Sequence, residues 1–96
     1  MIIYIDIDNT ICSTDLCDYY NSKPIFENIK KANKLFDDGH EIIYWTGRGT
    51  GTKRDWTDVT LRQLKMWGVK YHKLLFNKPV YDLFIDDKNM NTKDWK

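Results

Sequence analysis

The sequence has few cysteines and no long apolar run, and these absences exclude several classes of protein. Its two cysteines, Cys12 and Cys17, are too few for a disulfide-rich secreted scaffold, and no Cys/His cluster with zinc-ligand spacing accompanies them. The N-terminus lacks the basic segment of a signal peptide, and no stretch approaches the roughly 18 apolar residues of a membrane span. We therefore expect a soluble, cytoplasmic protein with reduced thiols and no membrane partner.

The chain also lacks a strong excess of charge of either sign. Its 15 basic and 14 acidic residues leave a formal net charge of +1. Proteins that bind long polyanions usually carry a marked basic excess, so a small anionic substrate is favoured over nucleic acid. The 96 residues suffice for one domain spanning 1–96. Aromatic residues make up 15% of the chain, which is enough for a core and for a self-association surface.

Apolar runs of strand length alternate with helical periodicities. A helix is predicted from Pro24, because Ile25, Ile29, Ala32 and Phe36 recur every three or four residues. A second helix is predicted near 56–67, and residues 8–23 are polar and irregular. The predicted strands are 2–7, 41–45, 73–76 and 82–85. This order favours an α/β fold of Rossmann-like type, a three-layer α/β/α arrangement around a central parallel sheet.

Polar residues gather where these predicted strands end, and ligands of parallel sheets bind at that edge. Lys78 lies just before the fourth predicted strand. The remaining polar residues follow the first, second and fourth strands: Asp6 and Asp8; Thr46, Gly47 and Arg48; Asp86 and Asp87. Arg48 and the amides around Gly47 could grip a phosphate. Several carboxylates at one edge repel one another, and Mg²⁺ would relieve that repulsion.

Each of these signals has an ordinary structural explanation when it is taken alone. An Asp-x-Asp at a strand end is often turn chemistry, and Thr-Gly is a turn signal. The basic residues of the 46–55 loop could form a solvated surface. The joint occurrence of all these polar signals, in this order and at the ends of the predicted strands, favours a functional site.

The motifs resemble those of the haloacid dehalogenase-like phosphohydrolases over nearly the whole chain. The run from Asp6 to Thr10, Asp-Ile-Asp-Asn-Thr, is similar to the first motif of that family, Asp-x-Asp-x-Thr. Thr46 is similar to the second motif, Lys78 to the third, and Asp86-Asp87 to the fourth. Lys73 is a rival for the third motif.

The resemblance implies a Mg²⁺-dependent phosphomonoester hydrolase. It implies that Asp6 forms an aspartyl-phosphate and that Asp8 serves as general acid and base. It further implies that Thr46 binds a phosphate oxygen and that Lys78 balances charge. The metal would be held by Asp6, the Asp8 carbonyl and Asp86, with Asp87 assisting.

The chain differs from most of that family in having no room for a cap domain. The resemblance therefore implies an open site, acting on a large substrate or covered by a neighbouring copy in a homo-oligomer. The capless outline, the Thr-Gly-Arg at 46–48 and the Lys-Pro at 78–79 are similar to small phosphatases of capsule and polysaccharide synthesis, which implies a sugar phosphate or related metabolite. The 46–55 loop is also similar to the phosphatase half of polynucleotide kinases. A non-catalytic binding domain of the same fold is the third interpretation.

Overall fold

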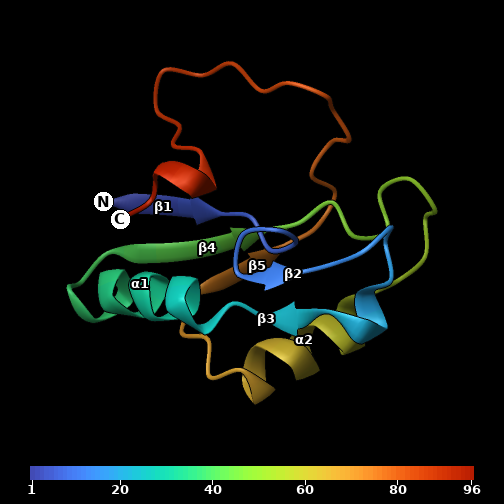
Figure 1. Ribbon diagram of the computed structural model, residues 1–96, viewed down its shortest axis with the longest axis horizontal. Coiled ribbons are helices and arrows are strands. Elements are labelled where there is room, and N and C mark those ends of the chain that lie inside the picture. The colour runs from blue at the N-terminus through green and yellow to red at the C-terminus, as the bar shows by residue number, and fades with distance from the viewer.

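A parallel sheet of three strands forms the centre of the protein. The computed structural model describes residues 1–96, and the strand order is β1-β4-β5 (Figure 1). The strands are β1 (Ile2–Ile5), β4 (Glu41–Trp45) and β5 (Lys73–Leu75). In the parallel register, Ile5 of β1 lies beside Tyr44 of β4, which lies beside Leu74 of β5. Three of the four predicted strands are therefore present, and β1 ends before Asp6 rather than after it.

Two helices follow the periodicities predicted from the sequence. They are α1 (Phe26–Asp37), where Ile29 and Ala32 are buried, and α2 (Thr57–Met66), where Leu64 is buried. Helix α1 lies in the connection from β1 to β4, and α2 lies in the connection from β4 to β5. Parallel strands need such long connections, and these usually contain a helix. Neither helix is long and apolar enough to cross a membrane.

Both helices pack against the same face of the sheet. Side chains alternate along a strand, and Ile5, Ile42 and Tyr44 point to the side that carries the buried residues of α1 and α2. The opposite face holds Tyr4, packed edge-on against Trp45 at a ring-centroid distance of 6.0 Å. The expected three-layer arrangement is not present, since no helix covers that second face. The observed architecture is an α/β fold of two layers.

Residues 8–23, expected to be irregular, contain a small two-stranded ribbon. Strand β2 (Cys12–Ser13) pairs antiparallel with β3 (Lys23–Pro24), and the 3₁₀ turn η1 (Tyr19–Asn21) lies between them. The ribbon holds this segment beside the carboxyl ends of the central strands (Figure 1).

The fourth predicted strand, at 82–85, does not form. Residues 79–91, here called the arm, leave the carboxyl end of the sheet and arch away from it (Figure 1, orange to red). The arm ends at the 3₁₀ turn η2 (Thr92–Asp94), where the Thr92 and Thr10 hydroxyls lie 3.1 Å apart. Strand β1 is consequently an edge strand, bonded to β4 alone.

Candidate active site

The carboxyl ends of β1 and β4 bring the predicted acidic and basic residues together. Asp6 and Asp8 follow β1 directly, and Thr46 follows β4. The backbone of Thr46 donates to the Leu75 carbonyl at 2.9 Å and accepts from the amide of Lys78 at 3.1 Å. These bonds fix the segment after β5 against the end of β4, which places the Lys78 side chain at the same rim.

Asp6 faces Lys78 across this rim. The Lys78 Nζ lies 3.5 Å from Asp6 Oδ1, and the Lys78 side chain is largely buried. Burial raises the pKa of the Asp6 carboxyl, and the positive charge of Lys78 opposes that rise. The rival Lys73 lies at the start of β5, 3.8 Å from Glu41, so Lys78 is the lysine that reaches Asp6.

Asp8 is held by an arginine forty positions away in the sequence. Arg48 donates through Nη2 to Asp8 Oδ1 at 2.9 Å and through Nε to Asp8 Oδ2 at 3.0 Å. The Thr14 hydroxyl donates to Asp8 Oδ1 at 2.6 Å. Both carboxylate oxygens of Asp8 therefore have donors within the chain.

Arg48 is a buried residue, although the sequence suggested that it would face a substrate. Only 2% of it is exposed. Its Nη1 donates to Gln63 at 2.6 Å and to Thr60 at 3.1 Å, both on the buried face of α2. Its guanidinium also lies over the Tyr19 ring, 4.9 Å from the centroid. As placed, Arg48 positions Asp8 and has no donor directed at the open rim.

Thr46 and Gly47 shape the floor of the site. The Thr46 side chain is fully buried, and its hydroxyl oxygen accepts from the Arg48 amide at 3.1 Å. As placed, the Thr46 side chain does not line the open pocket and is covered from solvent. At Gly47 a Cβ atom would lie 3.2 Å from the Lys78 carbonyl, so the absence of a side chain lets these two segments approach.

An open pocket of about 380 Å³ lies over Asp6, Asp8, Gly47 and Lys78. Its other lining residues are Asn9, Tyr19, Pro79, Val80 and Tyr81. Sequence reasoning missed the two tyrosines, because each reaches the rim from a segment without a motif. Lys78 Nζ lies 5.5 Å from the centroid of the Tyr81 ring, within the range of a cation–π contact.

The two acidic residues of the fourth motif do not reach this pocket. Asp86 and Asp87 are exposed and lie on the arm. No group of three or more His, Cys, Asp or Glu side chains converges in a way that could hold a metal ion. Asp6 and Asp8 are the only carboxylates at the rim, and Asp8 is engaged by Arg48. The residues of one chain, as arranged, do not fit the expected Mg²⁺ site.

Comparison with known proteins identifies fold relatives only. The chain matches no protein-family model and no curated protein. It is similar to a crystal structure of a structural-genomics target protein from Vibrio cholerae, with a TM-score of 0.89 and 22% identity. That match covers 99% of this chain and 87% of the Vibrio chain.

A second similar structure comes from the Pnkp1/Rnl/Hen1 complex. The TM-score is 0.66 at 15% identity, over 98% of this chain and 31% of the other. The chain thus spans about a third of that larger protein. At such identities the two matches establish a shared fold.

Proposed function

We propose that this protein is a phosphomonoester hydrolase that uses Asp6 as a covalent nucleophile. The observation that carries the proposal is the pairing of Asp6 with Lys78, 3.5 Å apart, in an open pocket at the carboxyl ends of a parallel sheet. A carboxylate beside a fixed cation suits attack on a phosphate, because the cation offsets the repulsion between two anions.

The proposed reaction has two steps. An Asp6 carboxylate oxygen bonds to phosphorus, and the bond from phosphorus to the substrate oxygen breaks, so the alcohol leaves with a proton. Water then attacks the aspartyl-phosphate, releasing inorganic phosphate and regenerating the Asp6 carboxylate. Lys78 neutralises charge in both steps. For the Thr46 hydroxyl to donate to a phosphate oxygen, the residues that cover it have to move, because its side chain is fully buried.

Asp8 is the candidate for moving the proton in both steps. It lines the pocket with Asp6, but Arg48 and Thr14 occupy its two oxygens. To protonate a leaving oxygen, the Asp8 carboxyl has to turn away from at least one of these donors. The proposal includes dependence on Mg²⁺. The carboxylates of one chain, as arranged, do not form a binding site for this ion.

A small phosphorylated metabolite, such as a sugar phosphate, is the substrate class that we favour. The pocket of about 380 Å³ has the size of a small-ligand site and is not covered by a cap. The net charge of +1 gives the protein no general attraction for long polyanions.

One observation favours a second candidate, an end phosphatase for nucleic acids. A neighbouring pocket of about 430 Å³ is lined by basic and aromatic residues, including Lys53, Arg54 and Trp56. The Arg54 guanidinium lies 4.6 Å from the centroid of the Trp56 ring. Trp56 is buried beneath Arg54, so the exposed Lys53 and Arg54 are the side chains that can contact nucleic-acid phosphates.

Phosphate release from a substrate panel tests both candidates. The panel holds p-nitrophenyl phosphate, sugar phosphates and oligonucleotides phosphorylated at either end, each with Mg²⁺ and with a chelator. We expect turnover of the small esters with Mg²⁺, loss of turnover in Asp6→Asn, and unchanged turnover in the surface control Asp38→Asn. Preferred turnover of the oligonucleotides selects the second candidate. No turnover of any phosphate refutes the enzyme proposal and leaves the non-catalytic binding domain.

A further inference from the structure

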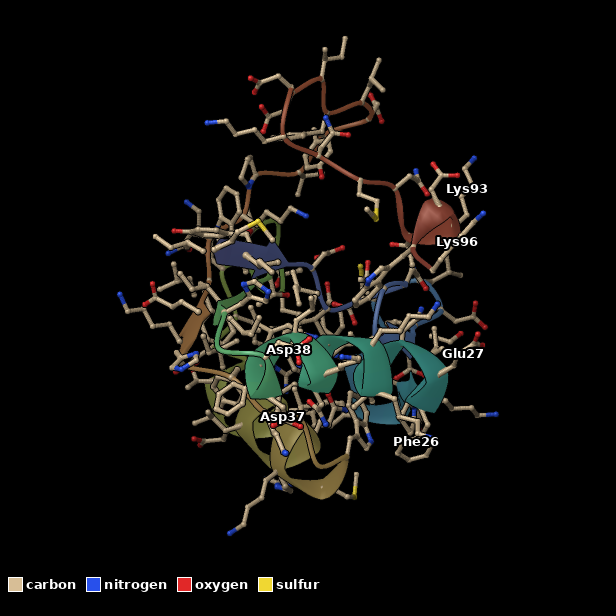
Figure 2. The ribbon with its side chains drawn as sticks, turned by 90° about the vertical axis from the view of Figure 1, so that its left-hand side faces the viewer. Phe26, Glu27, Asp37, Asp38, Lys93 and Lys96 are labelled. Carbon is tan, nitrogen blue, oxygen red and sulfur yellow. The ribbon has the colours of Figure 1, made fainter.

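The arm exposes a concentration of large apolar side chains. Ile85 is 88% exposed and Leu83 is 74% exposed. The other exposed apolar residues of the arm are Val80, Tyr81, Phe84 and Met90. Figure 2 shows the arm standing away from the rest of the protein at the top of the view. A run of exposed apolar residues of this length marks an interaction surface.

The first strand of the sheet offers a matching free edge. Strand β1 bonds to β4 on one side, and none of its backbone groups is bonded on the other side. On the face without helices, Ile2 is 66% exposed and Tyr4 is 56% exposed. An unpaired, apolar edge strand is a template for another strand.

The arm cannot reach this edge as a parallel strand within its own chain. Six residues, 76–81, separate the end of β5 from the apolar run at 82–85. Parallel strands need a connection of a dozen or more residues, because the chain must return to the amino end of the sheet. The bond from the Lys78 amide to the Thr46 carbonyl shortens the free length further, since it fixes the chain at the carboxyl end.

We propose that two copies of this chain exchange their arms. Residues 82–85 of one copy lie parallel to β1 of the other, along its free edge, and the exchange is reciprocal. A reciprocal exchange of identical elements closes into a symmetric dimer. The run Asp-Leu-Phe-Ile at 82–85 then buries its apolar side chains against the sheet of the second copy.

The exchange also completes the candidate site, and this part rests on the function proposed above. A strand parallel to β1 ends at the same edge of the sheet as β1. Asp86 and Asp87 of the second copy would therefore lie beside Asp6 and Asp8, which supplies the carboxylates that one chain lacks. Each site would contain residues from both copies.

The mass of the protein in solution tests the exchange without any assay of activity. We expect a dimer by light scattering, and a monomer for the double variant Leu83→Asp/Ile85→Asp. Met66→Asp, at an equally exposed apolar residue of α2, is the matched control and should remain a dimer. Phe84→Pro, which removes a backbone donor from the arm strand, should also give a monomer. Circular dichroism verifies that each variant is folded.

Two results would overturn the exchange. A monomeric wild-type protein would show that the arm stays with its own chain, for example as an antiparallel strand. A dimer that survives both arm changes would show that another surface holds the copies together.

Mixing two inactive variants tests the shared site. Asp6→Asn and Asp86→Asn/Asp87→Asn are refolded together so that mixed dimers form. If sites are shared, one site of each mixed dimer has all its carboxylates, and about a quarter of the wild-type activity returns. If each chain forms its own site, no activity returns and the shared site is refuted. An inactive wild-type protein refutes the proposed function, while the mass measurement still decides the exchange.

Discussion

Arg48 and Asp8 form a two-point ion pair, with Arg48 Nη2 at 2.9 Å and Nε at 3.0 Å from the two carboxylate oxygens. The Arg48 side chain is fully buried and the Asp8 side chain is 20% exposed, so solvent screens the pair weakly. Thr60 and Gln63 extend the contact into α2. The pair thereby connects the loop after β1, the loop after β4 and the second helix.

Removing Arg48 is predicted to destabilise the protein strongly. Arg48→Ala leaves the Asp8 carboxylate without its cation and two α2 acceptors without donors, which costs roughly 3–5 kcal/mol in other proteins. The free energy of unfolding from urea titrations measures this loss. Arg62→Ala, on the exposed face of α2, is the control and should change stability little. Equal stabilities of the two variants would show that the Arg48 contacts contribute nothing.

Gly47 is predicted to be needed for activity because of the close approach of Lys78. The added methyl of Gly47→Ala would lie 3.2 Å from the Lys78 carbonyl and push the Lys78 segment away from Asp6. Misplacing a catalytic group by a few tenths of an ångström should lower kcat/KM roughly tenfold. Gly51→Ala, where a Cβ meets nothing within 4 Å, should retain full activity. A Gly47→Ala variant with the kcat/KM of the wild-type protein would refute this role of the glycine.

Asp6 is predicted to lower the stability of the protein at neutral pH. Burial raises the pKa of Asp6 above its ordinary value of 3.8, although Lys78 opposes the rise. The folded state therefore holds this proton more tightly than the unfolded chain, and stability falls as pH rises through the window above 3.8. Asp6→Asn should raise the Tm at neutral pH in a chelator, with a smaller gain near pH 4. A lower Tm for this variant at neutral pH would contradict the sign.

The two cysteines are predicted to differ in reactivity. Cys12 is fully buried and Cys17 is exposed, and burial raises the pKa of the Cys12 thiol. A thiol reagent at mildly alkaline pH should therefore label one cysteine in the folded protein and both after denaturation. Mass spectrometry identifies the labelled residue, and Cys17→Ser should remove the rapid reaction. Equal labelling rates for both thiols would contradict the packing of β2.

Local sequence patterns predicted most of the fold because they depend on near neighbours. The apolar runs at 41–45 and 73–76 form β4 and β5 almost to the residue, and the period of Ile25, Ile29 and Ala32 gives α1. The run at 82–85 has the same local pattern, but a strand also needs a neighbour. The short connection at 76–81 prevents this chain from providing one.

The candidate site was predictable where it follows strand ends and not where it depends on distant contacts. Asp6, Asp8 and Lys78 line one pocket as their positions indicated, whereas the Thr46 side chain is fully buried. Arg48 pairs with Asp8, which lies forty positions away in the sequence, and no sequence motif predicts this pairing. Asp86 does not line the pocket, because the strand predicted at 82–85, which would have carried it to the rim, does not form.

Trapping the phosphorylated protein during turnover tests the role of Asp6 most directly. Wild-type protein is mixed with an excess of p-nitrophenyl phosphate and Mg²⁺, quenched in acid within one turnover, digested and analysed by mass spectrometry. Asp6 as nucleophile predicts one phosphoryl group on the peptide that contains Asp6, absent in Asp6→Asn. Phosphate release that continues in Asp6→Asn, or that proceeds with no phosphoryl group on that peptide, would contradict the covalent mechanism.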